Sequence, residues 1–400
     1  MSKRRVAIGS IAPWSPGHVV EESEFLLQKV CAFDRDIQVD YIMFPGTVST
    51  AFASVYGEYF LSKNINIISN NADIIRILSE TEELEKNFVP ISLAHSQYLP
   101  KSHSQTNGTS RILPCRVGIE QVSRGSLVFQ NQSHIDTITR TNQFSTNYYQ
   151  LHEQTALPRV EIGFLSRLLP QIRDKKIALI NIRTHSANNS FGLNLETYKP
   201  LIAYLQRNDY IVIDVSHEAK MFKEELEAAG AIAYWAIPEK SFLTDLELFS
   251  KASVYIGGGG ISHLALAYRV PTLWVSTVVP VLVPGFNSIQ LPCRLRPRLT
   301  GATLTFNDAF RLYTEFPDPW DEIYDDFSGK WGPGNPLNCI TRLKGKYFVD
   351  PPPPYNIAEA FKELEFINKN DQDKKIYFTL YDSRDLEGKN FISMKVAECF

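Results

Sequence analysis

The sequence predicts an α/β protein built on parallel sheets, and two observations predict this class. Short apolar runs, of the kind found in strands buried on both faces, alternate with amphipathic helical segments. This alternation occurs in two separate stretches of the chain. The 400 residues are enough for two domains, each with its own core. We therefore expect two α/β domains that face each other across a cleft.

Residues 1–156 are predicted to form the first α/β domain. Strands are expected at 5–8, 39–44 and 65–68, and a helix is expected at 19–33. Two polar stretches, 97–108 and 130–147, are rich in Ser, Gln, Asn and Thr. Such a composition is typical of loops, and we expect both loops to face the cleft.

Residues 157–175 are expected to form a linker with one amphipathic helix over 160–172, and residues 176–350 a second, more regular domain. The predicted strands of this domain are 177–182, 210–215, 231–236, 254–256 and 271–276. Its predicted helices are 196–207, 218–229 with Gly230 as C-cap, one that Ser241 caps and that runs through Phe249, and one that starts at Ile261. Strands and helices in this order predict a doubly wound parallel sheet, which binds ligands beyond the carboxyl ends of its strands.

Residues 351–400 are expected to form a C-terminal helix and tail that could pack back on the first domain. Pro351–Pro354 should be extended and stiff. A helix is expected over 356–367, with Asn356 as a possible N-cap, and a strand over 375–381.

Composition and charge exclude several classes of function. The 41 Lys and Arg residues nearly balance the 44 Asp and Glu residues, so no overall field recruits nucleic acid. The five cysteines are scattered, which argues against a zinc site or a disulfide framework. The apolar run Val6–Gly9 behind the basic N-terminus is too short for a signal peptide, and no stretch reaches the ~20 apolar residues of a membrane helix. We expect a cytoplasmic protein without a metal or cofactor.

The most informative motif is Gly257–Gly260, which separates a strand-like run from a predicted helix that starts at Ile261. A turn without Cβ atoms lets a ligand approach the backbone, and the free amides of a helix N-terminus favour an anion. A nucleotide diphosphate suits such a turn. On the glycines alone, tight packing of strand against helix explains the motif equally well.

Two common phosphate-binding motifs do not fit these glycines. A dinucleotide-binding turn would need a third small residue where His263 stands, and an acidic residue about twenty positions later, which is absent. A Walker-type loop would need Lys-Ser or Lys-Thr after the glycines. The hypothesis that remains is a nucleotide diphosphate held largely by backbone amides.

The residues from Gly257 onward resemble the signature of a known family. The string 257–267, followed by Val270-Pro271-Thr272, resembles the donor-site signature of heptosyltransferase-type GT-B glycosyltransferases. The segments 177–185, 240–245 and 16–21 are similar to a group of bacterial glycosyltransferases from surface-polysaccharide pathways. One position departs from the heptosyltransferase pattern, because Gly258 stands where family members usually carry an acidic or amide residue.

The resemblance implies a GT-B architecture with two facing Rossmann-like domains. It implies a nucleotide-sugar donor in the second domain and a glycan or glycolipid acceptor in the first. It further implies sugar transfer in the synthesis of a bacterial surface polysaccharide, with possible peripheral contact with the inner membrane.

Glycosyl transfer leaves negative charge on the departing diphosphate, which the site must neutralise. Since no Asp-x-Asp pair lies between residues 176 and 350, we expect a metal-independent site. The guanidinium of Arg183 can bind the diphosphate together with the turn, although Arg183 could instead form a salt bridge at the strand end. The residues expected to bind the donor are Arg183, His185, Lys240, Ser241, Gly258, Gly259, Gly260, Ile261, Ser262 and His263.

Several of these assignments leave a structural alternative open. His263 can bind a phosphate or cap the turn internally, and His185 can contact sugar hydroxyls or belong to a plain surface loop. The loop 235–241 is expected to read the base, with Lys240 or Ser241 near phosphate or ribose, although Lys240 can equally be a solvated charge.

An inverting transfer also needs a general base, which we expect on the first domain. The loop 10–18 should project into the cleft. His18 is the first candidate for this base and Glu21 the second, whereas Glu24 is better explained as a partner of the helix dipole.

Two other functions stay open on this sequence. A nucleotide-sugar epimerase or hydrolase on the same fold would turn over the donor without an acceptor. A non-catalytic protein that senses nucleotide sugars would bind the donor without turnover, and the missing side chain at Gly258 leaves that possibility open.

Overall fold

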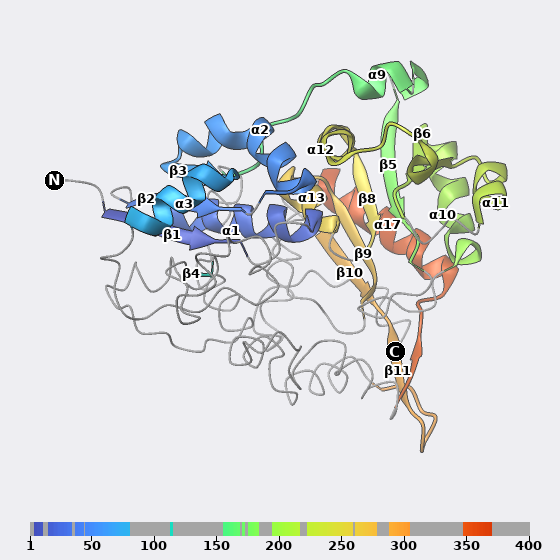
Figure 1. The fold of residues 1–400 in the computed structure, drawn as a ribbon. Helices are drawn as coiled ribbons and strands as arrows, with labels where there is room; N and C mark the ends of the chain where they lie inside the picture. The colour runs from blue at the N-terminus through green and yellow to red at the C-terminus, as the bar shows by residue number, and fades with distance from the viewer. Residues whose placement is uncertain are drawn as a thin grey trace.

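A computed structural model describes thirteen stretches of the chain, and the account below concerns these residues. They are 4–10, 15–33, 37–43, 45–80, 113–114, 155–168, 170–172, 175–183, 194–216, 222–258, 261–277, 288–304 and 347–369. Figure 1 shows them as a coloured ribbon; they form a four-stranded sheet, a six-stranded sheet and the antiparallel pair β11 (Arg294–Pro297) and β12 (Tyr347–Asp350).

The first sheet has four strands in the order β3-β2-β1-β4, and every neighbouring pair is parallel. The strands are β1 (Arg4–Gly9), β2 (Ile37–Ile42), β3 (Ile65–Ile68) and β4 (Leu113–Pro114), and the helices are α1 (Pro16–Phe33), α2 (Thr47–Leu61) and α3 (Asn71–Glu80). The predicted strands 5–8 and 65–68 and the predicted helix 19–33 are confirmed; the predicted strand 39–44 forms two residues earlier, as β2, and Phe44 lies outside the described residues. The polar stretches 97–108 and 130–147 lie outside the described residues.

Helix α2 was not predicted, and its burial explains why it forms. Phe52, Tyr56 and Phe60 stand four residues apart, so they share one face of the helix. All three are buried, with ring centroids 4.9 Å apart for Phe52 and Tyr56 and 5.7 Å apart for Phe52 and Phe60. Tertiary burial of this aromatic stripe outweighs the modest helix propensity of the residues.

The linker forms less helix than the sequence predicted. The expected helix over 160–172 is replaced by α9 (Phe164–Leu168) and the 3₁₀ turn η2 (Pro170–Ile172). Gly163 has a φ of 71°, a left-handed conformation that breaks a helix before Phe164. Pro170 cannot donate a backbone hydrogen bond, which ends the helical segment at its other side.

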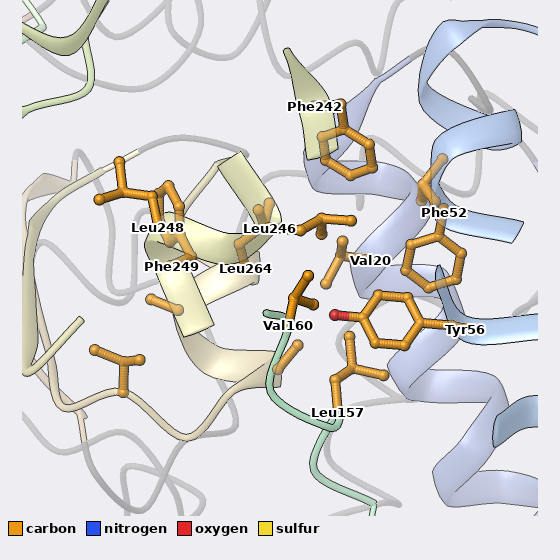
Figure 2. Packing of buried hydrophobic residues seen from close by; sticks show 14 of the residues in the cluster. Val20, Phe52, Tyr56, Leu157, Val160, Phe242, Leu246, Leu248, Phe249 and Leu264 are labelled. Carbon is orange, nitrogen blue, oxygen red and sulfur yellow. The ribbon is translucent and has the colours of Figure 1, made fainter. Parts of the chain in front are cut away.

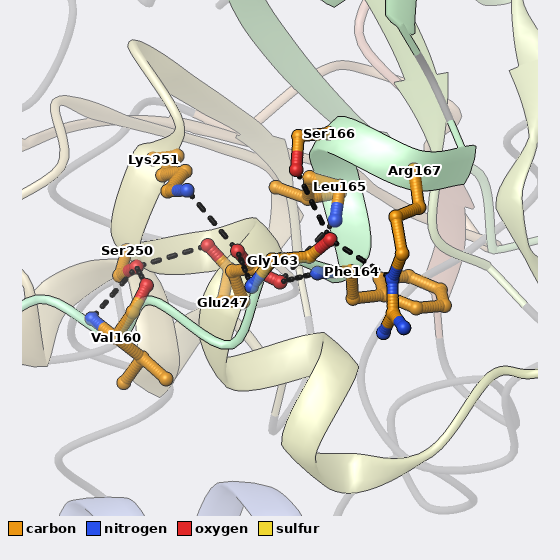
Figure 3. A network of polar contacts seen from close by, with 9 residues as sticks. All are labelled: Val160, Gly163, Phe164, Leu165, Ser166, Arg167, Glu247, Ser250 and Lys251. Carbon is orange, nitrogen blue, oxygen red and sulfur yellow. Dashed lines mark hydrogen bonds and ion pairs between the residues drawn. The ribbon is translucent and has the colours of Figure 1, made fainter.

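The linker is fastened to helix α12 (Phe242–Lys251) by the buried carboxylate of Glu247, as Figure 3 shows. Its oxygens accept hydrogen bonds from the amides of Gly163 at 3.1 Å, Phe164 at 2.9 Å and Leu165 at 3.3 Å. Lys251 lies 3.1 Å from the same carboxylate. Glu247 thus caps the N-terminus of α9 from a neighbouring helix, where the helix dipole favours a negative charge.

The second sheet has six strands in the order β10-β9-β8-β5-β6-β7, again with every neighbouring pair parallel. The strands are β5 (Lys176–Asn181), β6 (Tyr210–Asp214), β7 (Ile232–Ala233), β8 (Val254–Gly257), β9 (Thr272–Thr277) and β10 (Ser288–Pro292). The predicted doubly wound parallel sheet is confirmed. Strand β10 was not predicted, because the alternating pattern loosens after Ser276.

One predicted strand is only partly right. Of the run 231–236, only Ile232 and Ala233 pair as a strand, and Tyr234–Ala236 turn into the 3₁₀ helix η4. The hydroxyl of Tyr234 is drawn inward, 2.8 Å from both Thr244 Oγ1 and Asp245 Oδ1 on α12. This buried contact bends the chain away from the sheet edge after Ala233.

The remaining helices of this half are α10 (Leu195–Arg207), α11 (Lys223–Ala228), α13 (Ser262–Ala267) and α17 (Pro354–Lys369). Helix α11 ends just before Gly230 as predicted, with Ala229 as the C-cap and Gly230 one position beyond it: the φ of Gly230 is 79°, its amide bonds to Glu227 O at 2.8 Å, and Ala231 N bonds to Leu226 O at 3.1 Å. Within the predicted helix 218–229, residues 218–221 lie outside the described residues.

The C-terminal helix forms where predicted, but with a different start. Helix α17 begins at Pro354, so Asn356 lies inside its first turn and is not the N-cap. Pro is well suited to the first helical position, because its missing N–H would have no helical partner there. Helix α17 packs against α10, β9 and β10 of the second sheet. The predicted strand 375–381 lies outside the described residues.

The helices of the two sheets share one hydrophobic core. Helix α1 packs against α13, and α2 packs against α12. Figure 2 shows Val20, Phe52 and Tyr56 from the first half facing Leu246 and Leu264 from the second. The described residues therefore record a packed contact between the halves, while the expected cleft stays a prediction.

A buried ion pair lies beside this core. Arg269 follows α13 with a φ of 61°, and its guanidinium binds the carboxylate of Glu24 on α1, the carbonyl of Leu266 at 2.7 Å and Thr155 Oγ1 at 3.1 Å. The left-handed conformation costs a non-glycine residue about 1–2 kcal/mol. Glu24 is thus a partner of Arg269 in the interface, and its predicted role as a dipole partner is replaced by this ion pair.

Replacing Glu247 by Ala should lower the free energy of unfolding by about 2–4 kcal/mol, because three amides and an ammonium lose a buried charged acceptor. The measurement is urea unfolding followed by circular dichroism. Glu196→Ala, on an exposed i,i+3 pair with Lys199, is the matched control and should leave stability nearly unchanged. Equal unfolding midpoints for the two variants would contradict the capping role.

Candidate functional site

The candidate site lies where the second sheet reverses its winding. From the central strand β5 the chain proceeds outward through β6 and β7, then crosses back to β8 and continues through β9 to β10. Strands β5 and β8 are therefore adjacent but lead into opposite halves of the sheet. In open parallel sheets a ligand crevice forms outside the carboxyl ends of such a strand pair.

Arg183 and the first two residues of the glycine run lie at the carboxyl ends of the two strands at this switch point. Asn181 at the end of β5 is paired with Gly257 at the end of β8, so Arg183 and Gly258 leave the sheet at the same edge. This register agrees with the expectation that the two elements can converge, and donor binding by them stays a prediction.

Close packing explains why residue 257 is a glycine. Its φ is 153°, and a Cβ added there would lie 2.7 Å from Asn181 Cβ and 3.0 Å from the carbonyl oxygen of Asn181. A Cβ on Gly258 would lie 3.3 Å from the carbonyl oxygen of Val275. The packing interpretation of the glycine run therefore holds for its first two members. Gly259 and Gly260 lie outside the described residues.

A layer of buried polar groups lies beneath the turn. Asn181 Nδ2 donates to Gly258 O at 2.6 Å and to the Tyr255 hydroxyl at 3.0 Å. The Tyr255 hydroxyl donates to Gly258 O at 3.3 Å, and the Tyr198 hydroxyl donates to Asn181 O at 3.3 Å. These bonds tie the carbonyl at the start of the turn to the sheet.

Arg183 is half-buried at the end of β5. Burial raises the pKa of the Tyr255 hydroxyl, and the positive charge of Arg183 acts in the opposite direction on the same group. The guanidinium charge therefore acts on the polar layer that supports the glycine turn.

A second polar group at this edge is Asp214, the fully buried last residue of β6. Its oxygens accept from the Ile182 amide, the Ser216 amide and the Trp235 indole. Burial raises the pKa of Asp214 to about 7, and these hydrogen bonds lower it in part.

The sequence analysis did not single out Asn181, Tyr255 or Asp214. The available signal was a polar residue at the end of an otherwise apolar strand, as Asn181 and Asp214 are. Their partners come from neighbouring strands, so this signal alone could not say what they bind.

Three further predicted donor residues lie at the start of α13. Ser262 is fully buried, whereas Ile261 and His263 are half-buried. The His263 ring meets Trp274 of β9 edge-on, with centroids 5.9 Å apart. The role of His263 toward a ligand stays a prediction.

Lys240 and Ser241 make internal contacts. Ser241 caps α12 as predicted, because its hydroxyl accepts from Thr244 N at 3.3 Å in a capping box. Lys240 lies 3.6 Å from Asp245 Oδ1 and 5.5 Å from the Tyr234 ring centroid. The alternative of a solvated charge at Lys240 is therefore wrong, and donor contact at either residue stays a prediction.

The candidate bases lie on α1, which packs against α13. His18 and Glu21 belong to its first and second turns, and their side chains lie outside what the structure describes. His185 also lies outside the described residues. Their predicted roles are therefore carried by the sequence alone.

A pocket of about 630 Å³ runs along the edge strand β7. It is lined by Lys223 and Glu227 of α11, by residues 230–233, and by residues 236–239. The last of these segments belongs to the loop predicted to read the base.

Within the described stretches, no three His, Cys, Asp or Glu side chains are grouped so that they could hold a metal ion. Over the same stretches, no helix combines the length and the apolar character needed to cross a membrane.

Comparison with solved structures places glycosyltransferases and epimerases among the similar folds. The E. coli heptosyltransferase WaaC with ADP-2-deoxy-2-fluoro heptose is 17% identical over 78% of this chain and 99% of that one, with a TM-score of 0.40. The glycosyl transferase family 9 protein from Veillonella parvula is 12% identical over 86% and 97%, with a TM-score of 0.42. UDP-GlcNAc 2-epimerase from Neisseria meningitidis is 12% identical over 85% and 98%, with a TM-score of 0.30.

No protein-family model matches the chain, and no curated protein matches it. The structural likenesses are of low identity and assign no activity.

Gly257→Ala should destabilise the protein by at least about 2 kcal/mol, because the Cβ would enter space that Asn181 occupies at a backbone conformation that disfavours a side chain. Gly57→Ala in α2 is the matched control, since a Cβ there meets nothing within 4 Å. It should stabilise the helix by about 0.5–1 kcal/mol. Thermal unfolding of both variants provides the measurement, and a neutral effect at Gly257 would contradict the packing role.

Proposed function

We propose that this protein is a glycosyltransferase that moves a sugar from a nucleotide-sugar donor to a glycan or glycolipid acceptor. The observation that carries the proposal is the convergence of Arg183 and the glycine turn at the switch point of the six-stranded sheet. A cation and a turn without side chains at such an edge suit a diphosphate.

The chemistry of transfer gives each element a role. Cleavage of the bond between the anomeric carbon and the diphosphate places negative charge on the leaving group. Arg183 would neutralise this charge, and the amides of the turn from Gly259 to Ser262 would donate hydrogen bonds to the phosphate oxygens. The loop 235–241 would contact the base, with Lys240 and Ser241 near phosphate or ribose.

The first half of the chain would hold the acceptor. His18, with Glu21 as second candidate, would take the proton of the attacking hydroxyl in an inverting transfer without a metal. Helix α1 carries both residues and packs on α13 directly after the glycine turn, which supports a fixed spacing between base and donor. The resemblance in the sequence supports bacterial surface-polysaccharide synthesis, in the cytoplasm and in peripheral contact with the inner membrane.

Arg183→Ala should weaken binding of a nucleoside diphosphate by roughly 10- to 100-fold and should change nucleoside binding little, because the lost contact is a charged one to phosphate. A thermal-shift screen of UDP, GDP, CMP and ADP sugars first identifies the nucleotide. Calorimetry then compares that diphosphate with its nucleoside.

Arg207→Ala on α10 is the matched control, since Arg207 is an exposed arginine away from the switch point. It should bind like the wild type. An equal loss of diphosphate and nucleoside affinity in Arg183→Ala would rule out the phosphate role.

His18→Ala should reduce sugar transfer by at least about 100-fold while donor affinity stays unchanged, because a general base acts on the acceptor only. The measurement is product formation with donor alone and with donor plus an acceptor panel. Turnover of donor without acceptor would favour the epimerase or hydrolase, and donor binding without any turnover would favour the sensor.

A further inference from the structure

Asp214 connects the carboxyl ends of three strands. It is paired with Ile180 of β5 on one side and with Ala233 of β7 on the other. Its carboxylate accepts from Ile182 N at 3.5 Å, Ser216 N at 3.2 Å and Trp235 Nε1 at 3.1 Å. Each donor follows a different strand, so one buried group joins the segments that leave β5, β6 and β7.

Ser216 also binds the backbone of Ile182. Its hydroxyl donates to the Ile182 carbonyl, while the Ile182 amide donates to Asp214. The carbonyl of Ile182 belongs to the planar peptide unit that leads into Arg183. Asp214 and Ser216 together therefore fix the backbone from which the Arg183 side chain projects.

The other oxygen of Asp214 reaches toward the opposite end of the candidate site. It binds the indole of Trp235, which lies in η4 at the start of the loop 235–241. Displacement of this indole would shift the segment that leads to Lys240. A single carboxylate thus contacts both the strand end that carries Arg183 and the loop predicted to read the base.

We propose that Asp214 is a positioning residue that couples Arg183 to the loop 235–241, so that the two ends of a bound nucleotide are held at a fixed spacing. This inference rests on the proposed function, because it assigns a nucleotide to that edge of the sheet. Asp214 is fully buried and acts through Ile182 and Trp235 without touching the nucleotide.

The charge state of Asp214 supports this arrangement. An ionised carboxylate only accepts hydrogen bonds, which matches its three N–H donors, whereas a protonated one carries a donor among them. Its pKa of about 7 places this change between pH 6 and pH 8. The ionised form above pH 7 is therefore the one that holds all three segments.

The other titratable groups recorded around Asp214 keep their charge in this range. Burial raises the pKa of Tyr198 on α10 and of Tyr255 on β8 above the ordinary value for tyrosine, and the negative charge of Asp214 raises both further. The guanidinium charge of Arg183 also reaches Tyr255. Of Asp214 and the two tyrosines, only Asp214 titrates between pH 6 and pH 8.

Asp214→Asn tests the geometry apart from the charge. Asparagine is isosteric but places an amide N–H₂ opposite either the Trp235 indole or the two backbone amides. If Asp214 acts by positioning, this variant should bind UDP or ADP, and the matching nucleoside, at least about tenfold more weakly. If Asp214 acts only through its negative charge, the variant should bind the diphosphate more tightly, and that result would overturn the proposal.

The double variant Asp214→Asn/Trp235→Phe removes the donor that opposes the new amide. Its affinity should recover to that of Trp235→Phe alone, which we expect to be several-fold weaker than wild type. If Asp214→Asn does not fold, Trp235→Phe alone tests the coupling, because it removes the indole N–H that binds Asp214. Wild-type affinity in Trp235→Phe would overturn the coupling. Asp40→Asn, at a buried aspartate on β2 of the other sheet, is the matched control and should bind like the wild type.

A measurement without ligand separates this inference from the proposed function. The indole N–H resonance of Trp235, identified by its loss in Trp235→Phe, should titrate with a midpoint near pH 7 in wild type and not in Asp214→Asn. An indole resonance at the same chemical shift in wild type and in Asp214→Asn would overturn the coupling even if nucleotides bind, because the indole would then have no bond to the carboxylate to lose. An indole that titrates in a protein that binds none of the nucleotides would instead overturn the nucleotide site, and with it the role of Asp214 there.

Discussion

The close approach of β8 to β5 is the constraint on which the rest of the candidate site depends. At its carboxyl end, this pair leaves no room for a side chain at Gly257, because Asn181 occupies the space. The same pairing brings Asn181 Nδ2 within 2.6 Å of the carbonyl oxygen of Gly258. The polar layer beneath Gly258 and the placement of Arg183 at the same end of the sheet both depend on this strand pairing, which Gly257 permits.

The contact between the helices of the two sheets combines apolar packing with a buried ion pair. Packing of α1 on α13 and of α2 on α12 creates a shared apolar core, and within it a buried charge pair needs more than its own attraction. Arg269 obtains this support from a carboxylate, a backbone carbonyl and a hydroxyl at once. These bonds offset the cost of its left-handed backbone and fix α1, with His18 and Glu21 on it, relative to the helix after the glycine turn.

The sequence predicted best where local pattern and tertiary demand agree. Residues 177–182 are apolar except for Asn181 and are bounded by Lys176 and Arg183, and β5 lies within one residue of this run. Prediction failed at Tyr234, where the apolar run continues but the strand ends because the hydroxyl binds Asp245. It also failed at 160–163, because Glu247 of another helix accepts a hydrogen bond from the amide of Gly163. Both errors come from partners that are distant in sequence, which periodicity does not register.

The same distinction applies to the site. Convergence of Arg183 with the glycine turn follows from a rule about parallel sheets, so it could be predicted from strand order alone. The contacts of Asn181 and Asp214 could not be predicted from the sequence, since they depend on which strands lie beside β5 and β6.

Asn181 also bears on Gly258, the one position that departs from the heptosyltransferase pattern. Gly258 has no side chain of its own, and an amide from the neighbouring strand instead binds its carbonyl from below. A Cβ at 258 would lie 3.3 Å from the Val275 carbonyl oxygen, so a side chain there would require a small shift, and the side chain that binds the Gly258 carbonyl comes from β5 instead.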